Sequence, residues 1–318
     1  MLAIEADGLT KHYGTATAVD DLTWSLPAGE ACAFLGPNGA GKSTALRMLL
    51  GFTPASRGTC RVLGENPWEM APATRARIGY VAEQSILPPW MRVGALLDFH
   101  RSLYPRWNRE HERALCDVLE VSREPRVSQL SKGQNRRLAL LLALAQDADL
   151  LVLDEPGAGL DVAARRQLLS LLGEFLAGEG KTVLFSTHLV TDVERIASRV
   201  AVLARGRLVA DAELDELHEN VKSVRLAREV FERTRERWAA AGLLEVATDE
   251  RTANLVVRHF ATQGRFILRD LAEGEVVVAE SDRGATYMGS DGREARVTNL
   301  ALEDIFLALA GQGEGARG

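Results

Sequence analysis

The chain has 318 residues, of which 46% are hydrophobic and 26% charged, and it carries a formal net charge of −6 at pH 7. These values are typical of a globular protein with one large or two smaller domains, and they exclude a strongly basic surface for nucleic acid. The longest apolar run, Leu138 to Ala145, is too short to span a bilayer. Three scattered cysteines and an N-terminus without signal-peptide features predict a protein of a reducing, cytoplasmic compartment.

The first 35 residues alternate short apolar stretches with turns. Leu2 to Ala6 and Ala18 to Leu26 are apolar, and Pro27 to Glu30 is a turn, which predicts antiparallel strands leading into a central strand. Tyr13 falls in the first loop. An aromatic ring there can stack on a nucleotide base or pack in the turn, and the segment by itself favours packing.

A phosphate-binding loop follows, in the segment FLGPNGAGKSTAL at residues 34–46. Gly36 to Ser43 match the pattern G-x-x-x-x-G-K-[ST], between a buried strand and a helix over Thr44 to Leu50. The glycines let backbone N–H groups point at an anion, and the helix aims its positive dipole end at the same place. Lys42 is expected to reach the outer phosphates and Ser43 to ligate Mg²⁺. A glycine-rich turn that binds no ligand explains the strand before this loop and the helix after it less well. We therefore predict a nucleoside triphosphate site.

The middle of the chain is a helical block, roughly residues 85–147, inside an otherwise α/β pattern. The expected elements are a polar helix near Ala71 to Arg77, a strand over Ile78 to Ala82 ending at Glu83-Gln84, and helices over Val93 to Leu103 and Asn108 to Leu119. The block closes with Gln129 to Gln134 and an apolar helix over Asn135 to Ala145. Ser131 is expected to cap that helix, whose N-terminus can bind an anion, although this segment alone favours a capped core helix.

Polar residues end two buried strands. Leu150 to Leu153 is a continuous apolar run followed by Asp154 and Glu155, where a carboxylate beside a phosphate loop can hold Mg²⁺ and the next one can accept a proton from water. Thr182 to Ser186 is a second such strand and leads to His188. Because open α/β sheets bind ligands at the carboxyl ends of their strands, we expect His188 to contact the γ-phosphate.

The remainder of the chain changes character at about residue 221. Before that point we expect a helix over Val162 to Leu176, a hairpin of Val200 to Leu203 with Arg207 to Ala210, and a short helix over Asp211 to Glu219. Beyond it, short valine-rich strands (Val221 to Leu226, Leu255 to Val257, Gly274 to Ala279), a charged helix over Arg228 to Ala241 and a last apolar helix over Leu300 to Ala310 predict a small accessory α+β domain. No chemistry-bearing cluster is apparent there.

The order of these motifs resembles that of the nucleotide-binding subunit of ATP-binding cassette (ABC) transporters, across roughly residues 1–220. The resemblance implies a P-loop NTPase core with an antiparallel β subdomain and an inserted helical subdomain, followed by an accessory domain over 221–318. It also implies ATP and Mg²⁺ as cofactors. The family's adenine-stacking aromatic falls on Tyr13, and its Walker A loop on Gly36, Pro37, Asn38, Gly39, Ala40, Gly41, Lys42, Ser43 and Thr44. Its Q-loop falls on Gln84, its signature motif on Ser131, Gly133 and Gln134, its Walker B acids on Asp154 and Glu155, its D-loop on Asp161, and its switch histidine on His188.

By this resemblance the catalytic residues are Glu155, His188 and Gln84, and Ser43, Gln84 and Asp154 are the metal ligands. The signature departs from the usual L-S-G-G-Q, because Lys132 replaces the first glycine. A lysine beside a triphosphate is electrostatically tolerable and can assist binding. Gly157-Ala158 also replaces the Thr-Ser that commonly follows Walker B. Neither change removes a catalytic group.

The family's mechanism implies two subunits that enclose two ATP molecules head to tail and drive an integral membrane permease subunit. Leu302 to Leu309 resembles the closing helix of bacterial exporter ATPases, and the Lys-containing signature and Tyr104 to Trp107 are more similar to an exporter subgroup with separate membrane subunits. We therefore expect a cytoplasmic exporter ATPase, peripheral on the inner face of the cell membrane, that binds no nucleic acid. The alternative is a soluble ABC-type ATPase acting as a regulatory or assembly switch. The cargo, the direction of transport, homodimer or heterodimer, and the role of residues 221–299 stay open.

Overall fold

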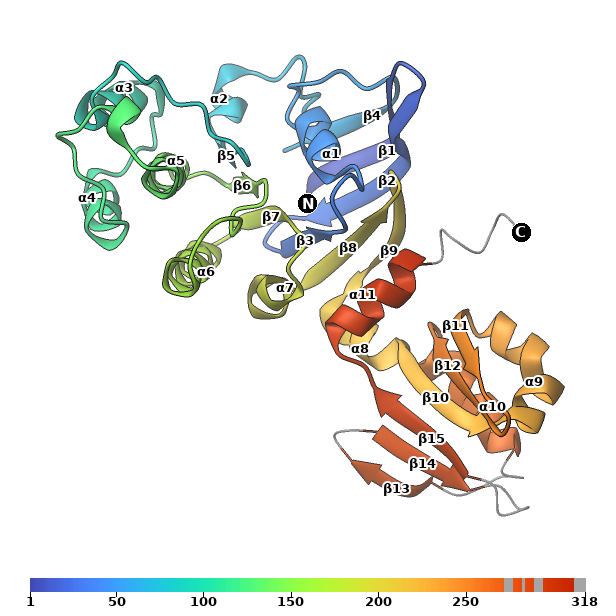
Figure 1. The fold of residues 1–318 in the computed structure, drawn as a ribbon. Coiled ribbons are helices and arrows are strands. Elements are labelled where there is room, and N and C mark those ends of the chain that lie inside the picture. The colour runs from blue at the N-terminus through green and yellow to red at the C-terminus, as the bar shows by residue number, and fades with distance from the viewer. Residues whose placement is uncertain (272–276, 282–283, 289–293, 312–318) are drawn as a thin grey trace. The chain divides into compact units, whose positions relative to one another are not determined.

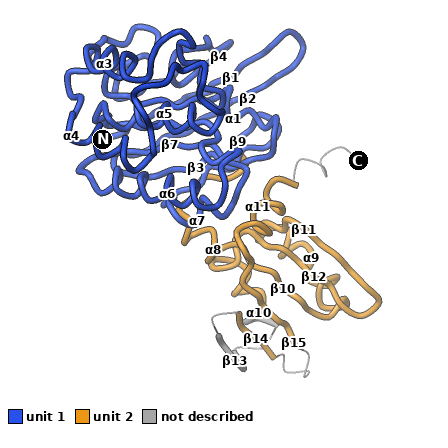
Figure 2. The backbone as a smooth tube through the Cα atoms, turned by 60° about the vertical axis from the view of Figure 1, so that its left-hand side comes forward, with its two compact units in different colours: residues 1–208 blue, residues 209–318 orange. Residues whose placement is uncertain are grey.

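The computed structural model describes residues 1–271, 277–281, 284–288 and 294–311. The chain divides into two compact units, Met1–Leu208 and Val209–Gly318 (Figure 2). This division falls within strand β9 (Arg207–Glu213), earlier than the boundary expected at residue 220. The division into a first domain over residues 1–220 and an accessory domain over 221–318 stays a prediction. No helix of the described residues has the length and apolarity needed to cross a membrane.

A six-stranded sheet forms the centre of the first unit (Figure 1), with strand order β5-β6-β7-β3-β8-β9. Besides β9, the strands of this sheet are β3 (Ala31–Leu35), β5 (Ile78–Val81), β6 (Leu150–Leu153), β7 (Thr182–Thr187) and β8 (Arg199–Ala204). Every residue of β3, β6 and β7 is buried, as their continuous apolar runs predict. Because β3 pairs in parallel with both β7 and β8, and β7 with β6, the carboxyl ends of these strands meet at one edge. That edge is where the phosphate loop, Asp154 and His188 emerge.

A second, three-stranded sheet is antiparallel, with order β2-β1-β4. Its strands are β1 (Leu2–Tyr13), β2 (Ala16–Pro27) and β4 (Arg57–Val62), which confirms the expected antiparallel β subdomain. The first two strands are longer than the sequence pattern indicated. Tyr13 is consequently the last residue of β1, where it pairs with Ala16, and the expectation that it lies within a loop was wrong.

Helices cover the sheet and build the inserted subdomain. The described helices of the first unit are α1 (Lys42–Leu49), α2 (Pro72–Arg75), α3 (Val93–Leu103), α4 (Arg109–Val118), a 3₁₀ turn over Val127–Gln129, α5 (Lys132–Ala145), α6 (Val162–Leu176) and α7 (Val190–Ile196). In Figure 1, α3, α4 and α5 gather on the side of the sheet away from β1, β2 and β4. The expected helical subdomain at about 85–147 is thus present.

A buried carboxylate holds this helical subdomain together. Glu112 on α4 is 2% exposed; its carboxylate accepts hydrogen bonds from Arg101 of α3 at 2.7 Å and from the Trp107 indole N–H at 2.8 Å. Arg123 adds an ion pair at 2.5 Å. Burial alone would raise the pKa of Glu112, but these donors lower it below its ordinary value. The carboxylate therefore stays charged and fixes α3 to α4.

The second unit contains an antiparallel sheet with strand order β11-β12-β10-β15-β14-β13. Its strands are β10 (Lys222–Ala227), β11 (Leu243–Thr248), β12 (Thr252–Val257), β13 (Val277–Ser281), β14 (Gly284–Met288) and β15 (Glu294–Asn299). Its helices are α8 (Leu214–Asn220), α9 (Arg228–Ala240), a π-helical turn over Phe260–Gly264, α10 (Arg265–Leu271) and α11 (Leu302–Gly311). Phe231 and Trp238 of α9 and Leu268 of α10 pack with alternate strand residues into one core. Residues 274–276 of one predicted strand lie outside the described residues.

Candidate functional site

The phosphate loop connects the buried end of β3 to the first residue of α1. Two of its glycines are required by close backbone contacts: a Cβ on Gly36 would lie 2.4 Å from the Leu203 carbonyl oxygen. Gly41 has φ +103°, a conformation that side chains rarely adopt, and a Cβ there would lie 2.4 Å from the Ala18 carbonyl oxygen. The sequence pattern predicted this geometry from the glycine positions alone.

Lys42 is buried at the start of α1, with 5% of its side chain exposed. Its Nζ donates to the carbonyl oxygens of Gly36, at 2.7 Å, and Pro37, at 3.3 Å. The same atom lies 3.1 Å from Glu155 Oε1. The ammonium group is therefore held between the loop and an acidic residue, a position from which it can contact a phosphate bound on the loop.

Asp154 ends β6 and is fully buried. Its Oδ1 accepts hydrogen bonds from the hydroxyls of Ser43, at 2.9 Å, and Ser186, at 2.7 Å. Its Oδ2 is buried without a hydrogen-bond partner among the described residues. An unsatisfied carboxylate oxygen beside a serine hydroxyl is a donor set that suits Mg²⁺, which prefers oxygen ligands and takes few of them from the protein. Two of the three predicted metal ligands are thus together.

Glu155 lies next to the lysine and connects it to the predicted histidine. Its Oε2 is 2.9 Å from His188 Nδ1, and its backbone N–H donates to the Ser186 hydroxyl at 2.8 Å. The residue is 8% exposed and has φ +48°, a left-handed backbone that a non-glycine residue adopts only when its surroundings hold it there. The lysine, the glutamate and the histidine form one connected chain.

One residue of this arrangement was missed in the sequence: Arg136 of α5. Its guanidinium donates to the Glu155 carbonyl oxygen and, at 2.6 Å, to the Ala158 carbonyl oxygen. Burial lowers the pKa of Arg136, and the nearby acidic residues Glu83 and Glu155 counteract that effect. The sequence offered no signal for it, because Arg136 is one of two consecutive arginines on an apolar helix and its partners are backbone atoms.

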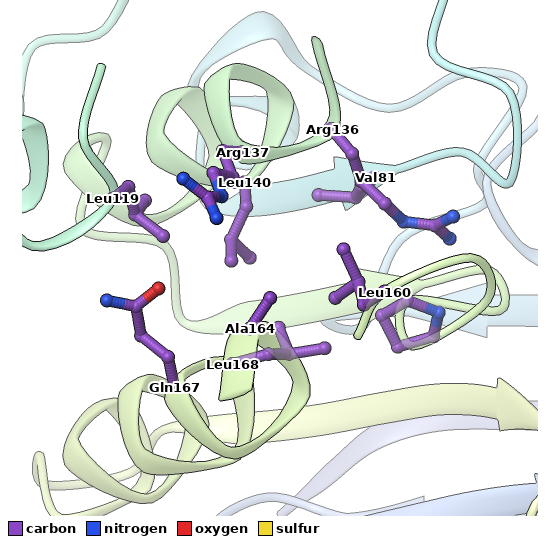
Figure 3. A pocket seen from close by; sticks show the side chains of 10 residues that line it. Val81, Leu119, Arg136, Arg137, Leu140, Leu160, Ala164, Gln167 and Leu168 are labelled. Atoms are coloured by element: carbon purple, nitrogen blue, oxygen red, sulfur yellow. The ribbon is translucent and has the colours of Figure 1, made fainter. Parts of the chain in front are cut away.

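Figure 3 shows the region between α5 and α6. Arg136, Arg137 and Leu140 come from one helix and Ala164, Gln167 and Leu168 from the other, around a cavity of about 20 Å³. Such a volume holds about one water molecule, and most of its walls are apolar. We interpret it as a packing gap between the helices, not as a ligand site.

The signature residues lie at the start of α5. Ser131 caps the helix, as predicted: its hydroxyl accepts from the Gln134 N–H at 3.2 Å, and Gln134 Oε1 accepts from the Ser131 N–H at 2.9 Å. Next to them, a Cβ on Gly133 would meet no atom within 4 Å. The space beside Gly133 at this helix start is therefore free of side chains of its own chain, and a helix N-terminus is a favourable place for an anion.

Of the remaining predicted residues, Gln84 lies with the signature motif, and Asp161 and Tyr13 lie elsewhere. Gln84, Gly133 and Gly159 line a common cavity of about 430 Å³, and none of the described residues 36–43 lines it. Asp161 caps α6 by accepting from the Ala164 N–H at 2.8 Å. Tyr13 is 50% exposed at the end of β1, with Lys11 Nζ 5.1 Å from its ring centre. The third predicted metal ligand, Gln84, has no hydrogen bond to Ser43 or Asp154 among the described residues.

Comparison with known proteins gives consistent matches. The family described as "ABC transporter" matches residues 19–158. The chain is 42% identical to the Nod factor export ATP-binding protein I of Paraburkholderia xenovorans (strain LB400) over 216 residues, which are 66% of this chain and 70% of that protein. It is 40% identical to the protein of the same name from Rhizobium johnstonii over 215 residues, 66% of this chain and 69% of that one.

Solved structures agree in fold. One described as the ATP binding subunit of an ABC transporter has a TM-score of 0.62 and 28% identity, covering 68% of this chain and 92% of its own. A dimeric ATP-binding cassette in a post-hydrolysis state with ADP and Pi has a TM-score of 0.61 at 22% identity, covering 66% of this chain and 98% of its own.

Proposed function

The chain belongs to the ABC transporter family of ATP-binding subunits, and from that membership we propose how its own residues carry out the family's work. As a member it binds and hydrolyses ATP, and it serves an exporter-type transporter. The observation that carries the proposal is the connected chain Lys42–Glu155–His188 beside a complete phosphate loop.

We propose that the backbone N–H groups of residues 36–43 and the Lys42 ammonium hold the ATP phosphates. Glu155 then polarises the attacking water, and His188, whose side chain is 41% exposed, fixes the γ-phosphate. Tyr13 presents its ring to the adenine. Phosphoryl transfer demands little of a protein beyond positioning and charge stabilisation, and these groups supply both.

Ser43 and the unsatisfied Oδ2 of Asp154 are the proposed holders of Mg²⁺, which when bound neutralises charge on the phosphates. Gln84 lines the cavity beside Gly133 and has no hydrogen bond to Ser43 or Asp154 among the described residues, so we propose that it approaches the metal only when the loop that carries it moves. Its position would then report whether ATP is bound.

Two copies of the chain are proposed to complete each site head to tail. Ser131, Gly133 and Gln134 form a capped helix start, where a Cβ on Gly133 would meet no atom within 4 Å. The phosphate loop of the same chain does not line the cavity of about 430 Å³ that Gly133 borders. An ATP on the loop of one copy would therefore meet residues 131–134 and Asp161 of the other. Homodimer and heterodimer both satisfy this geometry.

A mixing experiment tests the head-to-tail arrangement. Gly133→Asp places a carboxylate opposite the partner's triphosphate without a clash inside its own chain, since a Cβ there meets nothing. Lys42→Ala disables the loop. Each variant alone should be inactive, whereas a mixture should recover ATPase activity, because one of the two sites in a mixed dimer combines an intact loop with an intact signature.

The readout is phosphate release at constant total protein over a range of mixing ratios. Activity should pass through a maximum near equal proportions. If every mixture is as inactive as the separate variants, the nucleotide site is contained in one chain and the head-to-tail proposal fails.

We propose that a separate integral membrane subunit docks on the helical subdomain, which would hold the chain at the inner face of the membrane. A groove of about 380 Å³ lined by Phe52, Tyr80, Ser85 and Tyr104, among others, borders the Gln84 loop. Next to it in sequence, Ile86 is 94% exposed. Apolar side chains exposed beside a groove are typical of protein interfaces.

Affinity purification from detergent-solubilised membranes should retain an integral membrane protein with the tagged chain, and Phe52→Asp should reduce its recovery while ATP binding persists. Phe266→Asp is the matched control, since Phe266 is 63% exposed but lies in the other unit. Recovery of no membrane protein with the unchanged chain would favour the alternative, an ATPase that acts as a regulatory or assembly switch.

A further inference from the structure

The open face of the second unit's sheet carries a cluster of arginines. Arg225 of β10, Arg251 before β12 and Arg296 of β15 line one cavity of about 360 Å³, together with Thr252 and Glu294. The three strands are neighbours in the order β12-β10-β15, so Arg225 and Arg296 lie on adjacent strands and Arg251 directly precedes the third. Alternate residues of these strands, such as Val224 and Val297, are buried in the core with α9 and α10, which directs Arg225 and Arg296 to the opposite face.

The arrangement is electrostatically costly without an anion. Arg225 and Arg296 are direct partners in the β10–β15 register, and like charges placed opposite each other destabilise a sheet. Glu294 Oε1 pairs with Arg296 at 3.0 Å, but the structure gives Arg225 and Arg251 no side-chain hydrogen bond or ion pair among the described residues. The cavity therefore has three guanidinium groups against one carboxylate.

Asp249, a carboxylate that acts on Arg225, is already engaged in hydrogen bonds. Asp249 accepts hydrogen bonds from the backbone N–H groups of Thr252, at 2.6 Å, and Arg251, at 2.8 Å, and from the Thr252 hydroxyl at 2.8 Å. These hydrogen bonds, of which the one from the Thr252 N–H has the largest effect, lower the pKa of Asp249 to about 2. Asp249 thus fixes the turn that carries Arg251. Its charge also acts on Arg225, although the two form no ion pair among the described residues.

We propose that this cavity binds a phosphate group, either on a small soluble molecule or on a lipid headgroup. A phosphate monoester has three strongly accepting oxygens, which match three arginines, whereas a carboxylate is satisfied by one arginine fork. The volume, about 360 Å³, leaves room for the group attached to the phosphate. None of the lining residues is aromatic, so bases of single-stranded nucleic acid would find no stacking surface.

Binding of inorganic phosphate is the first test, measured by titration calorimetry on the full chain. All proteins carry Lys42→Ala, so that the phosphate loop contributes little. The parent should bind phosphate, and R225Q/R296Q should bind it at least about tenfold more weakly, since two charge-assisted contacts are lost. Arg235→Gln is the matched control, because Arg235 is an exposed arginine on α9, on the other side of the sheet, and it should bind like the parent.

Sedimentation with phosphatidylcholine vesicles, with and without phosphatidic acid, distinguishes the two sources. Phosphate binding without vesicle binding assigns a soluble ligand, and arginine-dependent binding to phosphatidic acid assigns a headgroup. The inference is overturned if neither probe binds the parent at millimolar phosphate, or if R225Q/R296Q binds as tightly as Arg235→Gln. Its failure would leave the ATPase assignment intact, because the assay does not use that site.

Discussion

Replacing Glu155 with glutamine should slow ATP hydrolysis by about 10²–10⁴-fold, the usual contribution of a general base. The change keeps the shape of the side chain and its contact with His188, but removes the acceptor for the proton of the attacking water. It also removes the negative charge 3.1 Å from Lys42, so ATP should bind at least as tightly as before. Hydrolysis is measured by phosphate release and binding by nucleotide titration.

The same variant should accumulate as an ATP-bound dimer, because the closed state can no longer convert ATP to ADP. Size-exclusion chromatography with and without ATP detects this shift. Glu179→Gln, an identical change at an exposed loop position, should retain wild-type turnover and show no shift. Hydrolysis by the Glu155 variant at the wild-type rate would show that another group activates the water.

Replacing Lys42 with alanine should weaken ATP binding about 10- to 100-fold. A hydrogen bond to a charged group contributes about 1.5–3 kcal/mol, and 1.4 kcal/mol corresponds to a factor of ten. Lys42 is the only lysine of the loop motif, and its ammonium is already oriented by the carbonyl oxygens of Gly36 and Pro37. Titration with a fluorescent ATP analogue measures the loss.

Lys222→Ala provides the control, since it removes a lysine of the other unit and should leave ATP affinity unchanged. The Lys42 variant also leaves Glu155 buried without its cation, so thermal unfolding must be compared to show that the chain still folds. A folded Lys42 variant with wild-type affinity would exclude the proposed phosphate contact.

The first unit was largely predictable because its signals are local. Strong 3.6-residue periodicity gave the helices Val93–Leu103 and Val162–Leu176 with the bounds that the structure has, and continuous apolar runs gave β3, β6 and β7. The glycines of the phosphate loop predicted its backbone. Each of these features is determined by residues close together in the chain, so it can be predicted from a single sequence.

Other features depend on partners distant in the sequence and could not be predicted from it. Ser186 bonds both Asp154 and the Glu155 backbone, yet nothing in its own strand distinguishes it from any other strand serine. In the second unit, β11, β14 and β15 were missed because few of their side chains are buried. Such strands form because a neighbouring strand supplies backbone hydrogen bonds. Apolar and polar residues alternate only weakly in them, so their sequence does not identify them as strands.

The hydrogen bond from Arg136 to the Glu155 carbonyl oxygen can couple hydrolysis in one site to the binding of ATP in the other. Arg136 lies on α5, which Ser131 caps and which contains Gly133. In the proposed dimer, a rotation of α5 on meeting a second nucleotide would therefore pull on the backbone of Glu155, the proposed general base. Glu155 holds a left-handed conformation that needs such support. Hydrolysis in one site would thereby wait for the arrival of ATP in the other, which protects the cell from idle consumption of ATP by an unassembled subunit.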